Sequence, residues 1–244
     1  MSTLYLIRHS QASFGKADYD CLSDLGQAQS KILADHFHNL ELEFDTIYSG
    51  SLLRHEQTLT AYLDNLAASG KKIPFVHKNE AFNEYDSENI LKTLIPEMIR
   101  EEPAFEAEVT MMFSDKRSFQ MVYEKVMRKW INSANPTKSS ENKPKNKPET
   151  WKTYSDRVRT GLNEIMATED TGKKIAVYTS GGPISVCIQK ALNLSDENTL
   201  QLTWQIMNAS VTRLIYSGNR LALSEFNNAT HLALKKDSKL ITYR

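Results

Sequence analysis

Arginine, histidine and serine side chains stand at three places where a predicted strand turns into a predicted helix. Arg8 and His9 follow the apolar run 4–7, and Arg54 follows a turn of small residues in "YSGSLLRHEQT". Ser180 and Gly181 open the third junction, in "VYTSGGPISV". Guanidinium groups and the free N–H groups of helix N-termini attract anions, and an imidazole beside them can act as a nucleophile. These residue types predict a site for a phosphate-sized anion.

Each junction has an ordinary structural explanation when it is taken alone. An Arg-His pair is typical of a solvated strand end, and an arginine such as Arg54 is typical of a helix surface. Gly-Gly-Pro is typical of a tight turn, with Pro183 at the first helical position. Their occurrence at the same kind of junction favours one shared site, because ligands of open α/β sheets bind at the carboxyl ends of the strands.

Short apolar runs alternate with amphipathic runs along most of the chain. Apolar residues at helical spacing follow Ser23, the expected N-cap, and a second helix is expected to start at Ser51 and stop at Gly70. The predicted strands are 3–8, 45–48, 73–77, 175–179, 211–216 and 221–226. The alternation predicts an α/β fold, a three-layer α/β/α sandwich with a mostly parallel central sheet. The turn "SGNR" joins the last two strands and adds an antiparallel edge.

The middle of the chain has a different pattern. Long helical runs fill residues 87–134, and the segment 135–149 is polar and rich in Pro, Lys and Asn. We interpret 135–149 as a flexible surface loop; a nucleic-acid tail is disfavoured because its lysines have no aromatic residues between them. Residues 85–150 are therefore predicted to form a helical cap insertion that carries this loop.

The composition is that of an ordinary globular protein. Of the 244 residues, 40% are hydrophobic and 25% charged, and the formal net charge is zero. This balance gives no overall attraction to nucleic acid or to an anionic membrane. No signal peptide, long apolar span or metal-ligand spacing is visible, and Cys21 and Cys187 are far apart. We predict a cytoplasmic protein with reduced thiols and no metal or cofactor; the oligomeric state stays open.

Six segments of the sequence resemble segments of the histidine phosphatase superfamily, the phosphoglycerate mutase-like proteins. "LIRHSQAS" resembles the Arg-His-Gly opening of that family, "LSDLGQAQ" the helix after it, and "SGSLLRHEQT" the Ser-x-Leu-x-Arg-x-x-Gln-Thr pattern. "FNEYD" resembles the segment with an acidic residue, "ETWKTYSDRV" a later helix, and "TSGGPIS" the segment of a second histidine. The resemblance implies a single histidine-phosphatase-like domain over residues 1–244.

The resemblance also implies a role for each matching residue. His9 would be the nucleophile that forms a phosphohistidine, and Arg8 and Arg54 would clamp the phosphate. Glu84 would donate a proton to the leaving oxygen and then help to activate water. Other acidic residues lie near Glu84 in the chain, and only the resemblance selects it. The expected activity is hydrolysis of a phosphorylated small molecule.

The sequence departs from the family pattern at two positions. Ser10 stands in the place of the glycine, and Ser180 in the place of the second histidine, which binds the transferring phosphoryl group. Losing one such donor costs about 3 kcal/mol, or roughly 10²–10³ in rate. The Gly181 N–H and the helix N-terminus would recover part of this loss. His231 is a candidate to reach over the site, His55 is expected to face away from it, and Ser180→His is expected to raise activity.

Three alternatives to a histidine phosphatase remain open from the sequence. The first is a binding protein on the same scaffold that holds a phosphorylated ligand and turns it over slowly or not at all. The second is a phosphoglycerate mutase-type transferase, which "SQASFGK" after His9 disfavours. The third is a serine hydrolase with Ser180 as nucleophile and His231 as base, although Tyr178 stands where the G-x-S-x-G pattern needs glycine.

Overall fold

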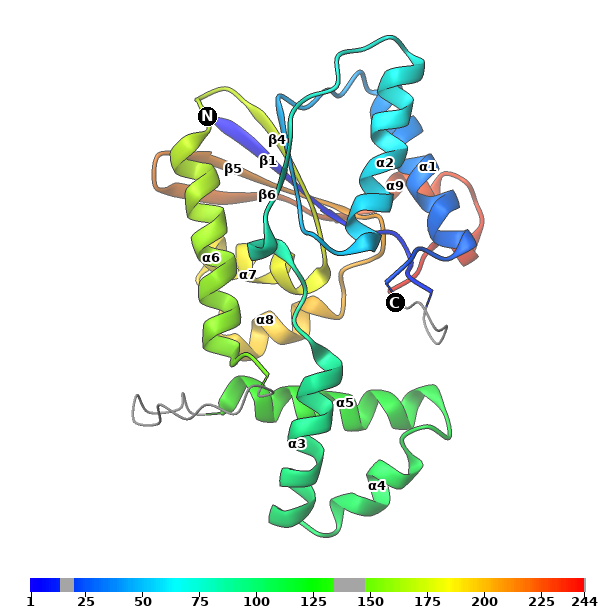
Figure 1. Ribbon diagram of the computed structural model, residues 1–244, viewed down its shortest axis with the longest axis vertical. Helices are drawn as coiled ribbons and strands as arrows, with labels where there is room; N and C mark the ends of the chain where they lie inside the picture. The colour runs from blue at the N-terminus through cyan, green and yellow to red at the C-terminus, as the bar shows by residue number, and fades with distance from the viewer. Residues whose placement is uncertain (14–19, 134–147, 244) are drawn as a thin grey trace. The chain divides into compact units, whose positions relative to one another are not determined.

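The computed structural model describes residues 1–13, 20–133 and 148–243 (Figure 1). Within these residues, six strands form one mixed sheet in the order β3-β2-β4-β1-β5-β6. The strands are β1 (Ser2–Arg8), β2 (Thr46–Ser49), β3 (Val76–Lys78), β4 (Lys174–Thr179), β5 (Val211–Ser217) and β6 (Arg220–Asn228). β3, β2, β4 and β1 run parallel, and β5 and β6 add an antiparallel edge. The predicted α/β fold with a mostly parallel sheet is confirmed.

The central strand β1 contributes to the packing on both faces of the sheet. Tyr5 and Ile7 belong to the core that includes Phe37 and Tyr62, from helices α1 (Asp24–Asn39) and α2 (Leu53–Ala68). Because side chains alternate along a strand, the fully buried Leu4 points to the opposite face. Helices α6 (Trp151–Thr168) and α7 (Gly181–Leu192) lie on that face, with α8 (Asp196–Thr203) next to α7 (Figure 1).

Two predicted element boundaries are wrong for local reasons. The edge strand β3 starts at Val76 rather than residue 73, because Pro74 has no N–H to donate to a sheet ladder. Helix α2 starts at Leu53 rather than Ser51, and its N-cap makes no side-chain hydrogen bond of its own. By contrast, Ser23 caps α1 as predicted, since its side chain accepts a hydrogen bond from the Gly26 N–H.

The chain divides into two compact units, Met1–Glu84 with Arg157–Arg244, and Tyr85–Asp156. The second unit contains α3 (Ser87–Glu101), α4 (Phe105–Met111) and α5 (Lys116–Asn132). The rings of Tyr85 and Trp130, 4.9 Å apart, pack in its core. That residues 85–150 act as a cap stays a prediction, and most of the predicted loop 135–149 lies outside the described residues. None of the helices in the described ranges is long and apolar enough to cross a membrane.

Candidate active site

The carboxyl ends of β1, β4 and β2 lie side by side, so the structure brings the three predicted junctions together. Arg8 pairs in register with Thr179, and Ser49 pairs with Tyr178. The His9 N–H continues the ladder by donating to the Thr179 carbonyl at 2.8 Å. The turns after the three strands therefore open at the same edge of the sheet.

His9 is buried, and its two ring nitrogens have different partners. Nδ1 lies 2.7 Å from the Ser10 carbonyl oxygen, which can only accept, so Nδ1 carries the hydrogen. Nε2 accepts a hydrogen bond from Arg54 Nε at 3.2 Å, so its lone pair points toward the guanidinium. Burial, then the charges of Arg54 and Arg8, hold the pKa of His9 well below its usual value. The ring is therefore a neutral imidazole at neutral pH.

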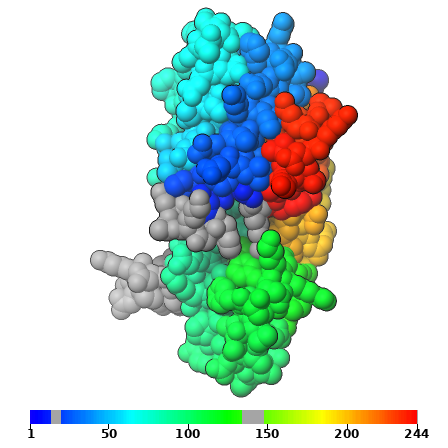
Figure 2. Space-filling view, turned by 90° about the vertical axis from the view of Figure 1, so that its right-hand side faces the viewer, coloured from blue at the N-terminus to red at the C-terminus, as the bar shows by residue number. Residues whose placement is uncertain are grey.

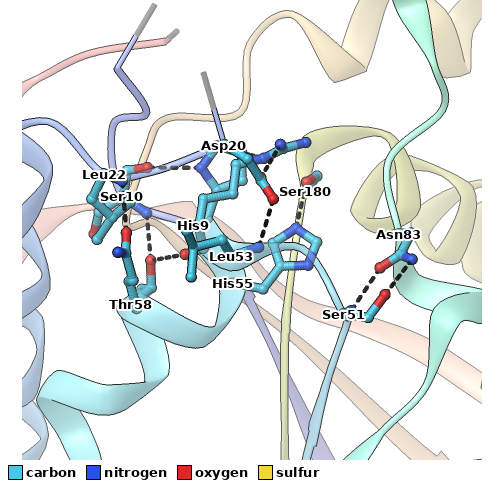
Figure 3. A network of polar contacts seen from close by, with 12 residues as sticks. His9, Ser10, Asp20, Leu22, Ser51, Leu53, His55, Thr58, Asn83 and Ser180 are labelled. Atoms are coloured by element: carbon cyan, nitrogen blue, oxygen red, sulfur yellow. Dashed lines mark hydrogen bonds and ion pairs between the residues drawn. The ribbon is translucent and has the colours of Figure 1, made fainter. Parts of the chain in front are cut away.

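Asp20 holds the guanidinium of Arg54 from the other side. Asp20 Oδ1 lies 2.6 Å from Arg54 Nη1, and Oδ2 accepts from the Leu53 N–H at 2.7 Å. The carboxylate thus caps α2 in place of the missing N-cap side chain and pairs with the residue that faces His9 (Figure 3). Asp20 was not predicted from the sequence, in which its only signal is an acidic side chain between His9 and the first helix.

Arg8 lies next to the N-terminus of α7. Its Nη1 donates a hydrogen bond to the Ile206 carbonyl, which fixes the position of the guanidinium. A methyl group on Gly181 would lie 3.8 Å from Arg8 Nε, so the first residue of the helix and this guanidinium are neighbours. Both features favour an anion at the same place.

Glu84 accepts a hydrogen bond from the N-terminus of α7. Its Oε2 lies 3.0 Å from the Gly182 N–H. Ser180 is the N-cap of α7, so Pro183 occupies the third helical position rather than the first, which corrects the prediction. A proline fits there because the N–H groups of the first turn have no partner inside the helix. The Glu84 carboxylate and the Arg8 guanidinium thus both lie at the N-terminus of α7.

The segment that carries Glu84 is held from two sides. Arg157 Nη1 on α6 donates to the carbonyls of Glu80, Ala81 and Asn83, at 2.7, 3.0 and 3.2 Å. These contacts anchor η1 (Glu80–Phe82) and the residue before the acid. Asn83 also accepts from the Ser51 N–H at 2.7 Å (Figure 3). The segments "FNEYD" and "ETWKTYSDRV" are therefore joined through one arginine.

His55 does not face away from the site as expected. It is the third residue of α2, it is fully buried, and its Nε2 lies 2.7 Å from Ser180 Oγ (Figure 3). Its ring centroid is 5.7 Å from that of His9. Burial and the charge of Arg54 lower the pKa of His55 well below its usual value. A second neutral imidazole thus lies beside His9, but it comes from α2 rather than from the end of β4.

His231 does not reach the site. It lies on α9 (Thr230–Ala233), and its ring stacks on that of His36 in α1, with the centroids 5.3 Å apart. Figure 2 shows the C-terminal segment, in red, packed against the first helix, in blue. Burial, then His36, lower the pKa of His231 to about 4. The expectation that His231 replaces the missing histidine is therefore wrong.

The serine hydrolase alternative loses its structural basis. A nucleophile elbow needs a strained turn at the serine, whereas Ser180 has φ −115° and ψ 174°, an ordinary extended conformation. Its expected base, His231, lies elsewhere. The hydroxyl contacts His55, whose Nδ1 has no hydrogen-bond partner among the described residues, so no carboxylate orients that ring as a triad requires.

Ser10 takes the place of glycine without backbone strain. It is absent from the described residues that have a positive φ. Its N–H donates to Thr58 Oγ1 at 3.0 Å, and its Oγ accepts from Ser30 at 2.7 Å. The hydroxyl is therefore used to hold the turn after β1 against α1 and α2.

The described residues contain no group of three or more His, Cys, Asp or Glu side chains that could hold a metal ion. The site consists of arginine, imidazole, hydroxyl and carboxylate groups around a helix N-terminus. Such a set can bind an anion and provide a nucleophile and a proton carrier.

Comparisons with known proteins show which family this chain is similar to. The family model described as "Histidine phosphatase superfamily (branch 1)" matches residues 4–130 and 108–229. A comparison with curated proteins finds no match.

Solved structures with similar folds include three proteins from different organisms. A mycobacterial glucosyl-3-phosphoglycerate phosphatase with inorganic phosphate has a TM-score of 0.62 at 16% identity, over 94% of this chain and 98% of that one. Phosphoglycerate mutase from Bacillus anthracis has a TM-score of 0.59 at 19% sequence identity, over 97% of both chains. A mutant phosphoserine phosphatase from Entamoeba histolytica, in complex with phosphoserine, has a TM-score of 0.58 at 20% sequence identity, over 95% of this chain and 100% of that one. At these identities the likeness concerns the fold.

Proposed function

Because this chain belongs to the histidine phosphatase superfamily, we propose that it is a phosphomonoester hydrolase that acts through a phosphohistidine on His9. The observation that carries the proposal is the state of the His9 ring. Nδ1 is bonded to a carbonyl, and the lone pair of Nε2 faces Arg54 Nε at 3.2 Å. A phosphate bound by Arg54 would take over the N–H that the guanidinium donates to Nε2, which frees the lone pair of Nε2 to attack the phosphorus atom.

In the first step, His9 Nε2 attacks the phosphorus atom and the bond to the leaving oxygen breaks. Arg8 and Arg54, with the Gly181 N–H, neutralise the charge on the phosphoryl oxygens. Protonated Glu84 gives its proton to the leaving oxygen, so that an alcohol departs. The depressed pKa of His9 keeps the ring neutral and able to attack.

In the second step, water attacks the phosphohistidine. Glu84, now ionised, takes a proton from the water, the N–P bond breaks, and Nε2 recovers its lone pair. The products are an alcohol and inorganic phosphate. The proposed substrate class is a phosphorylated small molecule, in line with the substrates in the names of the similar phosphatases.

The test is hydrolysis of p-nitrophenyl phosphate in the presence of EDTA, with the wild-type protein and His9→Ala. Turnover that disappears in His9→Ala supports the proposal, and turnover that survives in the variant overturns it. If neither protein turns over, the hydrolase is refuted in favour of a phospho-ligand-binding protein. A rise in Tm with inorganic phosphate then checks the binding protein.

Glu84→Gln tests the proton donor. The amide oxygen of glutamine can still accept from the Gly182 N–H, which Glu84 meets at 3.0 Å, so the fold of the site is preserved. We expect kcat/KM, which reports the steps up to departure of the leaving group, to fall roughly 10²-fold or more with an alkyl phosphate and much less with p-nitrophenyl phosphate, whose leaving group needs no proton. Equal losses of kcat/KM with both substrates would contradict the role of Glu84 as proton donor.

A further inference from the structure

We propose that His55 and Ser180 act as one unit and do the work of the second histidine that position 180 lacks. In this arrangement the Ser180 hydroxyl donates to a phosphoryl oxygen, and His55 is the positioning residue that orients the hydroxyl. The inference rests on the proposed function and adds two residues to its machinery.

The first support is the place and the burial of the pair. Ser180 Oγ and His55 Nε2 are 2.7 Å apart, and neither residue is exposed to solvent. Ser180 caps α7, whose next residue lies beside Arg8, and the His55 ring lies 5.7 Å from the His9 ring. Ser180 therefore lies at the N-terminus of α7, directly before the residue that neighbours Arg8, and its hydroxyl oxygen contacts the imidazole of His55.

The second support is the tautomer of His55. Its Nδ1 has no hydrogen-bond partner among the described residues. A buried N–H without an acceptor is rare in proteins, which favours placing the hydrogen of the neutral ring on Nε2. Nε2 then donates to Ser180 Oγ. The hydroxyl hydrogen of Ser180 is left to donate to another group, as a phosphoryl oxygen requires.

The third support is the room that the chain leaves for this ring. A Cβ on Gly50 would lie 2.3 Å from His55 Nδ1 and 2.8 Å from its Cε1. The ring of His55 therefore packs directly on the Cα of a glycine at the end of β2. Any larger residue at position 50 would push the imidazole out of its contact with Ser180.

The same packing changes the expected result of Ser180→His. With Ser180 Oγ already 2.7 Å from the His55 ring, an imidazole at position 180 would collide with it. The single change is therefore expected to lower activity rather than raise it. The double variant His55→Ala/Ser180→His removes the obstacle and puts the imidazole where the family has it.

The experiment measures kcat and KM for p-nitrophenyl phosphate in the single variants His55→Ala, Ser180→Ala and Ser180→His, and in the double variants His55→Ala/Ser180→Ala and His55→Ala/Ser180→His. We expect each single variant to lose roughly 10²-fold in kcat with little change in KM, because the donor acts mainly in the transition state. The variant His55→Ala/Ser180→Ala should lose no more than either single variant. The double variant with histidine at 180 should recover at least tenfold over His55→Ala.

The control for the loss of a buried imidazole is His231→Ala. His231 is also buried, but it lies on α9 against α1, so its removal tests structural damage alone. Ser180→Ala, which removes a single oxygen, keeps the test valid if His55→Ala does not fold. Near-wild-type kcat in Ser180→Ala, or no recovery in a folded double variant, would overturn the inference. If the wild type requires His9 while Ser180→Ala is fully active, the proposed function stands and this inference fails.

Discussion

Gly50→Ala should damage the site without touching a charged residue. In the structure, the new methyl carbon would lie 2.3 Å from His55 Nδ1 and 2.8 Å from Asn83 Oδ1. Carbon and nitrogen atoms in contact need about 3.5 Å, so the imidazole must retreat by about 1 Å. Such a shift lengthens the 2.7 Å contact between His55 and Ser180 beyond the range of a good hydrogen bond.

The magnitude follows from two separate effects. Forcing one carbon into a filled core costs roughly 1–3 kcal/mol of stability. For a domain of this size, each kcal/mol lowers Tm by about 2–4 °C, so we expect a fall of about 2–12 °C. A displacement of about 1 Å at a catalytic group costs up to roughly 10²-fold in rate, so we expect kcat to fall by about that factor.

The assay compares Gly50→Ala in two backgrounds, wild type and His55→Ala. Because removal of the imidazole relieves the closest contact of the methyl group and leaves only the one with Asn83 Oδ1, Gly50→Ala should cost less in Tm and much less in kcat when His55 is already alanine. An unchanged Tm and kcat in the wild-type background would refute the packing argument. So would losses of the same size in both backgrounds, since they would show that the clash is with other atoms.

Two further predictions concern Asp20 and His231. Asp20→Asn removes a negative charge that lies 2.6 Å from Arg54 Nη1, while the side-chain amide can still cap α2. The Asp20 carboxylate repels an anion bound at Arg54, and removing about 1 kcal/mol of this repulsion should lower the constant for inhibition of the hydrolysis by inorganic phosphate about fivefold. An unchanged or higher inhibition constant would contradict this prediction. The pKa of His231 falls from 6.5 to about 4 on folding, so the unfolded chain binds more protons between these values and stability is lost as pH falls below about 6.5. Between pH 7 and pH 5, the free energy of unfolding of His231→Leu should therefore fall by about 2 kcal/mol less than that of the wild type, as measured by urea unfolding. Equal falls in both proteins would refute this prediction.

The parts of the fold that follow from local pattern could be predicted. The apolar run of β1 and the junctions after β1, β2 and β4 are visible in the sequence, and parallel register brings their ends to one edge. Arg8, His9 and Arg54 could be placed near one another on this basis alone. The limits of β3 and α2 were misjudged, because Pro74 and a cap supplied by Asp20 decide them.

The contacts of single side chains between distant elements could not be predicted. Whether the third residue of α2 faces the site depends on the tilt of that helix against the sheet, so His55 was assigned to the wrong side. His231 was given a place in the site, although α9 packs against His36 on α1 instead. The contact between His55 and Ser180 joins residues that are 125 positions apart, and no periodicity in a single sequence records it.

The position of β1 in the middle of the sheet has a consequence for folding. Thr3 pairs with Lys174 on one side and with Ile215 on the other, so the first strand finds its partners only in the last third of the chain. Contacts of such high sequence separation form slowly, because a long loop must close before they contribute. Until then β1 has two open edges and a run of apolar residues that other chains can pair with. The hydrogen bond from the His9 N–H to the Thr179 carbonyl, at the end of this strand, can form only once β4 has paired with β1, so completion of the candidate site should follow this long-range pairing in refolding.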